Sequence, residues 1–265
     1  MTDANTSAEA PALAPLPPVL TPRDESRIAF ARSVWAVWKS ADRLVPIDPE
    51  ALPGSLLTDA LALQADAEKT VGRAVVAERE RGTTWEQIAQ AAGITRQTAH
   101  ERWAHRARAW ADNGRTANAP GHTSAETARF LDSEYALAHP DQPHAVTAGL
   151  DAVRYPGSAA DQDARRARGR ALHTRREDLE RDADRLHEEW VRLKDPADRR
   201  GELRLAANLT AAADVHNALA DLYQELAAAE PELAEEHLGD VATWRERATQ
   251  NQSYADSALD RAGTA

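Results

Sequence analysis

The sequence lacks cysteine altogether, which excludes disulfide bridges, thiolate zinc sites, iron–sulfur clusters and cysteine nucleophiles. Phe and Met are also scarce, since two Phe and one Met accompany seven Trp and four Tyr, and alanine supplies much of the hydrophobic share of 42%. Alanine favours helix and buries little apolar area. We therefore expect an all-α protein with a thin core, and the absence of cysteine suits the cytoplasm.

Long hydrophobic runs are absent too. No stretch approaches 18 consecutive apolar residues, and the first 22 residues are acidic and proline-rich, unlike the basic and then apolar order of a signal peptide. We therefore predict no membrane span and no secretory signal, and we expect residues 1–22 to form a disordered tail.

Acidic residues outnumber basic residues over the whole chain, and the net charge is −11. This charge argues against nucleic-acid binding by the surface as a whole. One segment departs from this balance. Between Gly93 and Arg115 there are five arginines against Glu101 and Asp112, a local net charge of +3. Such a local excess is what a nucleic-acid-binding face requires.

The same segment belongs to a patterned stretch, residues 81–110, which reads RGTTWEQIAQAAGITRQTAHERWAHRARAW. Gly82 suits the left-handed end of a preceding helix, and Thr84 with Gln87 predicts a capping box. Gly93 and Thr95 predict a turn and a second cap. Apolar residues at helical spacing predict the buried faces of two short helices: Trp85, Ile88, Ala89 and Ala92 on the first, and Ala99, Trp103, Ala107 and Trp110 on the second.

These residues resemble a known family. The stretch TWEQIAQAAGITRQTAHERW is similar to the helix-turn-helix DNA-binding regulators common in actinobacteria and, more distantly, to the promoter-reading helix-turn-helix of bacterial sigma factors. The resemblance covers about residues 70–110 and implies binding to double-stranded DNA. One position departs from the family pattern, because Ala99 stands where valine or isoleucine is usual.

Helical geometry divides the second helix, residues 96–111, into an inner and an outer face. Side chains on the outer face are predicted to contact DNA. Base edges in the major groove are assigned to Arg96, Gln97, Glu101 and His105. Phosphates are assigned to Thr95, Thr98, Arg102, Arg106, Arg108 and Arg115. Ala104 is also placed on the outer face.

The last third of the chain predicts three antiparallel helices, as a bundle or a coiled coil, divided near Pro196 and Pro231. Each proline is expected at a first helical position behind an acidic cap, and the third helix is given a seam that includes Leu238 and Leu259. Between residues 205 and 244 there are eight acidic residues and no Lys or Arg. Two partners are left open here: a second copy of the chain through the C-terminal helices, and a basic protein at the acidic 205–244 face.

Proline, glycine and charge together predict four segments. These are the tail at 1–22, an N-terminal helical domain at 23–113 that contains the helix-turn-helix (84–110), a loosely structured connector at 114–157, and a C-terminal helical bundle at 158–262.

Signatures of enzymes are missing, since no GxxxxGK[ST], GxGxxG, HExxH or GxSxG motif occurs, and no histidine pair has metal-ligand spacing. We therefore expect no catalysis, no cofactor and no metal. The sequence favours a sequence-specific DNA-binding protein, a transcriptional regulator associated with the nucleoid in the cytoplasm. The alternative is a coiled-coil scaffold or adaptor whose helix-turn-helix is a packing or docking module.

Overall fold

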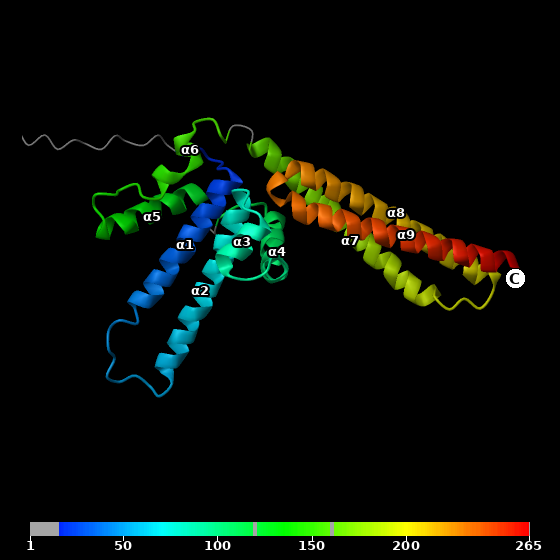
Figure 1. Ribbon diagram of the computed structural model, residues 1–265, viewed down its shortest axis with the longest axis horizontal. Helices are drawn as coiled ribbons and strands as arrows, with labels where there is room; N and C mark the ends of the chain where they lie inside the picture. The colour runs from blue at the N-terminus through cyan, green and yellow to red at the C-terminus, as the bar shows by residue number, and fades with distance from the viewer. Residues whose placement is uncertain (1–15, 119–120, 160–161, 265) are drawn as a thin grey trace, which may run out of the picture. The chain divides into compact units, whose positions relative to one another are not determined.

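The computed structural model describes residues 16–118, 121–159 and 162–264, and all regular secondary structure in these ranges is helical. The all-α prediction is confirmed. In chain order the elements are α1 (Pro22–Asp42), α2 (Ser55–Glu80), α3 (Trp85–Ala92), α4 (Arg96–Asp112), α5 (Ser124–Ala138), a 3-10 turn η1 (Thr147–Gly149), α6 (Asp151–Arg154), α7 (Gln162–Leu193), α8 (Arg199–Ala229), η2 (Pro231–Leu233) and α9 (Ala234–Thr264). Figure 1 labels the helices. None of the described helices is long and apolar enough to cross a membrane.

The chain forms two compact units, each built from two separate segments. Unit 1 comprises residues 1–78 and 115–163, and unit 2 comprises residues 79–114 and 164–265. The predicted boundaries at 114 and 157 lie near boundaries of these units. The grouping differs, however: the segment with α3 and α4 belongs with the C-terminal helices and not with residues 23–78.

Unit 1 is organised around α1, which packs against α5 and α6. Thr21 caps α1 by accepting a hydrogen bond from the Asp24 N–H, and Leu20 is 1% exposed. The predicted tail is therefore wrong at its C-terminal end, because Leu20 and Thr21 are part of the packed structure; residues 1–15 lie outside the described residues. The rings of Trp35 on α1 and Phe130 on α5 form a T-shaped pair, with ring centroids 5.1 Å apart.

Unit 2 contains the three long helices predicted from the last third of the chain. Figure 1 shows α7, α8 and α9 lying along one another, with alternating direction. One buried cluster joins Leu172 of α7 to Leu219, Leu222 and Leu226 of α8, and Val241 and Trp244 of α9 pack against it. A second cluster joins Leu205 and Leu209 of α8 to Ala255 and Ala258 of α9.

Two details of the predicted bundle are wrong. Pro196 lies in the loop before α8, whose cap is Asp198, so it does not occupy a first helical position. In α9 the buried face consists largely of alanine, whereas Leu238 and Leu259 are 53% and 48% exposed. Small side chains allow two helix backbones to approach closely, and this close approach selects the alanine face of α9 over the leucines.

Candidate nucleic-acid interface

The local structure between α2 and α4 follows the sequence closely. The Gln87 N–H donates to Thr84 Oγ1 over 3.3 Å, and Gln87 Oε1 accepts from the Thr84 N–H over 2.9 Å, which completes the predicted capping box. Gly93 ends α3 in the left-handed conformation with φ 67°. Thr95 caps α4 by accepting from the Thr98 N–H. The two helices and the turn between them therefore lie where they were predicted.

The inner face of α4 is buried as expected, since Ala99, Trp103, Ala107 and Trp110 are all between 0% and 6% exposed. The predicted faces are wrong at two alanines. Ala92 at the end of α3 is exposed, and Ala104 is 6% exposed although it was placed on the outer face. The buried stripe of α4 is consequently wider than the predicted one.

The four residues assigned to base edges, Arg96, Gln97, Glu101 and His105, are all exposed on α4. Gln97 Nε2 donates to Glu101 Oε1 over 2.8 Å, so these two side chains form one polar group along the helix. Near the start of the helix, the hydroxyl groups of Thr95 and Thr98 lie 2.8 Å apart in a hydrogen bond. This end of α4 therefore presents donors and acceptors to solvent.

Arg102 and Arg106 are the unneutralised cations of α4. Both are exposed, and neither forms an ion pair with the residues that the structure describes. The Arg102 guanidinium lies 5.1 Å from the centroid of the Trp103 ring, which is itself buried. These two arginines are consequently free to contact an external anion.

The other two arginines of α4 meet the acidic start of α9. Arg96 forms an ion pair with Glu235, and Arg108 forms one with Asp240 at 3.5 Å. The Arg96 and Arg108 side chains remain 57% and 48% exposed. The Arg96–Glu235 pair is exposed on both sides and contributes at most about 1 kcal/mol, whereas the Asp240 side chain is only 22% exposed. The acidic 205–244 face was predicted to bind another protein. At Glu235 and Asp240 it instead binds α4 of the same chain.

A buried contact beneath these pairs joins α2, α3 and α9. The Glu236 carboxylate accepts from Arg79 Nε over 3.0 Å, from Arg79 Nη2 over 2.8 Å and from Trp85 Nε1 over 3.1 Å. Arg79 and Glu236 are 5% and 2% exposed. Because the indole and the guanidinium share one carboxylate away from water, this contact fixes α3 against α9.

Two further contacts attach α4 within unit 2. Trp110 Nε1 donates to Glu80 over 2.8 Å, and Leu233 packs on Ala107 and Ala111. Burial raises the pKa of Asp240 above its ordinary value, and the cationic Arg108 opposes this shift. The exposed face of α4 is therefore carried on a rigid support.

The junction of α7 with η2 and α9 holds a buried carboxylate between two histidines. Glu230 Oε1 lies 3.2 Å from His173 Nε2, and Glu230 Oε2 lies 2.9 Å from His237 Nε2. No group of three or more His, Asp or Glu side chains within the described ranges has the arrangement of a metal site. Through Glu230, the cluster links His173 of α7 to His237 of α9.

Arg115 is the one predicted contact residue that does not fit the interface. It belongs to unit 1, is 8% exposed and adopts a left-handed backbone conformation with φ 53°. A buried guanidinium does not meet a phosphate group unless it leaves its site, so Arg115 is removed from the predicted set of phosphate contacts.

Sequence reasoning missed Arg79, Glu80 and Glu236, which hold the motif in place. Arg79 and Glu80 directly precede the motif, and their position at the end of a helix was the only local signal. Their partners could not be identified from spacing, because Arg79 and Glu236 are 157 residues apart. Comparison of the chain with models of protein families, with curated proteins and with solved structures finds no match.

Proposed function

We propose that the protein binds double-stranded DNA in a sequence-specific manner, as a transcriptional regulator that reads the major groove with α4. The observation that carries this proposal is the outer face of α4. It combines two unneutralised arginines, Arg102 and Arg106, with the exposed polar side chains of Gln97 and His105. Arginine and glutamine are suited to contacts with phosphate and with base edges.

The ion pairs with α9 bear on how DNA would bind. Arg96 and Arg108 pair with the carboxylates of Glu235 and Asp240, and both pairs must break before all four arginines of α4 contact the duplex. The exchange is inexpensive at Arg96, because its pair with Glu235 is exposed, and costs more at Arg108, because Asp240 is only 22% exposed. Under this proposal, the acidic start of α9 competes with DNA and lowers the affinity.

The test is a DNA titration of the full chain, with duplexes selected from a random pool and binding followed by fluorescence anisotropy at several salt concentrations. Arg102→Gln with Arg106→Gln is expected to weaken binding and to reduce the slope of log affinity against log salt by about 1.8, since each lost phosphate contact removes about 0.9. Arg170→Gln with Arg192→Gln provides the matched control, because both residues are exposed arginines of α7.

Two further variants of the same series separate base reading from competition. Arg96→Ala with Gln97→Ala is expected to abolish the preference for the selected sequence. Glu235→Gln with Asp240→Asn is expected to tighten binding. The proposal fails if the α4 and α7 double variants bind DNA equally well.

A second function, that of a scaffold or adaptor, is favoured by the buried contact of Glu236 with Arg79 and Trp85. This contact, together with Leu233 on Ala107 and Ala111, gives α3 and α4 a packing role on α9. The scaffold function predicts weak DNA binding that the α4 variants leave unchanged. The same titration therefore distinguishes the two functions.

A further inference from the structure

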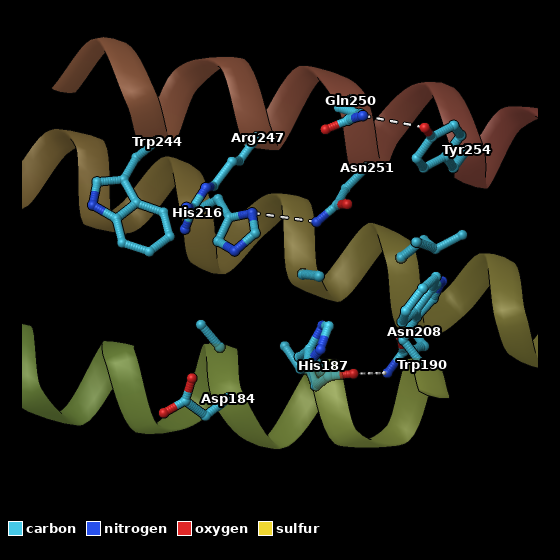
Figure 2. Close-up of a pocket in the computed structure, with 14 residues that line it drawn as sticks. Asp184, His187, Trp190, Asn208, His216, Trp244, Arg247, Gln250, Asn251 and Tyr254 are labelled. Atoms are coloured by element: carbon cyan, nitrogen blue, oxygen red, sulfur yellow. Dashed lines mark hydrogen bonds between the residues drawn. The ribbon is translucent and has the colours of Figure 1, made fainter. Parts of the chain in front are cut away.

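The bundle of unit 2 contains a pocket of about 410 Å³ between α7, α8 and α9 (Figure 2). Organic ligands occupy pockets of roughly this size in proteins. The pocket lies in the C-terminal helices, apart from the outer face of α4.

The pocket exists because the leucine seam of α8 is interrupted. Leu205 and Leu209 pack in one cluster, and Leu219, Leu222 and Leu226 pack in another. Beside Leu209, the side chains that α8 contributes to the pocket are Asn208, Ala212 and His216, which follow one another at intervals of four residues. Residues at this spacing lie on one face of a helix, so small and polar side chains leave space where leucine would fill it.

Asn208 provides an unsatisfied hydrogen-bond acceptor at the pocket. Its Nδ2 donates to the Leu186 carbonyl oxygen over 3.2 Å, whereas its Oδ1 is buried and has no hydrogen-bond partner among the described residues. The residue is 6% exposed. A buried acceptor without a partner is unfavourable, and rotation of the Asn208 amide toward the pocket would let a ligand N–H or O–H group satisfy it, since Oδ1 is closed to solvent in this structure.

His216 lies in the middle of the pocket wall, as Figure 2 shows. Its Nδ1 lies 3.2 Å from Asn251 Nδ2, and its ring centroid lies 5.1 Å from that of Trp244. Burial, followed by the nearby Arg247 cation, lowers the pKa of His216 below its ordinary value. A neutral imidazole beside an indole gives this part of the pocket a flat, weakly polar surface.

Arg247 supplies the positive charge of the pocket. Its guanidinium lies 4.7 Å from the centroid of the Trp244 ring, and it forms no ion pair with the described residues. Arg245, two residues earlier, is paired with Asp221. The single carboxylate that lines the pocket belongs to Asp184 on α7, which is exposed.

We propose that this pocket binds a planar aromatic carboxylate that carries an N–H or O–H group. The ring lies against the aromatic side chains, the donor meets Asn208 Oδ1, and the carboxylate pairs with Arg247. The opposite polarity of Asn208 Oδ1 and the Arg247 guanidinium selects a ligand with both a donor and an anionic group. Indole-3-acetate has all three features and serves as a probe.

The test is a titration of the full chain with indole-3-acetate, followed through the indole N–H signals of the tryptophans by NMR. The signals of Trp190 and Trp244, which line the pocket, are expected to shift and saturate together. The signals of Trp38 and Trp85, which do not line it, are expected to remain in place. Substitution of each tryptophan by phenylalanine assigns the signals. Absence of a saturable shift at Trp190 and Trp244 at millimolar probe overturns the proposal.

Arg247→Gln is expected to weaken binding about tenfold, because it removes the charged partner of the carboxylate. Arg245→Gln is the matched control on the same helix and is expected to leave the affinity within about twofold, since an exposed charge outside the pocket contributes little. Equal affinities of these two variants contradict the proposal. Both arginines are exposed, so neither substitution threatens the fold.

Discussion

The two units use buried carboxylates in different ways. In unit 1, Asp24 accepts from the backbone N–H groups of Asp151 and Ala152 over 2.8 and 2.9 Å, and Glu25 accepts from the N–H of Ala117 over 2.8 Å. These carboxylates satisfy N–H groups at the start of α6 and in the segment after α4. Unit 1 therefore uses its buried acids to hold these two places against the first turn of α1.

In unit 2 the buried carboxylates accept mainly from side chains of other helices. Glu236 binds Arg79 and Trp85, and Glu230 lies between His173 and His237. Removal of such an acid leaves a buried cation or a buried indole N–H without its hydrogen-bond acceptor. The difference teaches that the attachment of α3 and α4 depends on paired side chains, whereas the loops of unit 1 depend on backbone donors.

The largest expected effect comes from Glu236→Ala, which leaves the buried Arg79 without its carboxylate. We expect the free energy of unfolding to fall by about 3–5 kcal/mol, the usual cost of breaking a buried ion pair. Urea unfolding followed by tryptophan fluorescence measures the change. Glu235→Ala is the control at the adjacent position and should cost about 1 kcal/mol or less, because its pair with Arg96 is exposed. If Glu236→Ala and Glu235→Ala lowered the free energy of unfolding equally, the prediction that the buried pair contributes more than the exposed pair would be wrong.

A smaller loss is expected in unit 1. Glu25→Ala leaves the N–H of Ala117 without an acceptor, while the Ser124 hydroxyl keeps Asn118 Oδ1, and we expect a loss of about 1–3 kcal/mol. Glu50→Ala, an exposed acid in the same unit, is the control and should be nearly neutral. If Glu25→Ala lowered the free energy of unfolding more than Glu236→Ala does, the buried acid of unit 1 would contribute more to stability than that of unit 2, contrary to this prediction.

The smallest expected effect compares the capping boxes. Thr123 and Glu126 cap α5 in unit 1, while Thr84 and Gln87 cap α3 in unit 2. The hydrogen bond from the Thr123 N–H holds the pKa of Glu126 below its ordinary value of 4.5. Its contribution to stability is therefore present above the pKa of the unfolded chain and is lost as the pH falls through the lower, folded value. Gln87 does not titrate.

We expect Glu126→Gln to convert the box of α5 into a box like that of α3 and to remove this part of the acid sensitivity. Thermal unfolding at pH values between about 3 and 6 measures the difference, because the carboxyl group titrates in this range. An unchanged pH profile would show that the carboxylate of Glu126 does not act through the box.

Local structure was predictable wherever the interacting residues are close in sequence. The caps at Thr84 and Thr95 and the turn at Gly93 involve residues three or four apart, so their hydrogen bonds follow from spacing. The faces of the helices were harder to predict, because burial of Ala104 and exposure of Leu259 depend on which neighbour packs there. Alanine buries little apolar area, so its position in the sequence does not show whether it faces the core or the solvent.

Most of the candidate site was predicted as a list of exposed residues, but its surroundings were not. Arg96 and Glu235 are 139 residues apart, and nothing in either segment identifies the other. The charges suggested a partner for the acidic region, and the sequence could not indicate that α4 of the same chain would neutralise part of it. The interruption of the α8 leucine seam was likewise hidden, because the spacing of Asn208, Ala212 and His216 does not show whether a neighbouring helix fills the space beside them.

The discontinuous make-up of the units limits how the protein can be dissected. Since each unit is assembled from two stretches that alternate along the chain, no single truncation yields either unit intact. Shortening the chain after α6 would strip Arg79 and Trp85 of Glu236 and would expose the inner side of α4. A fragment of this kind would test a damaged protein, so the roles of α4 and of the bundle are best separated by point substitutions in the full-length chain.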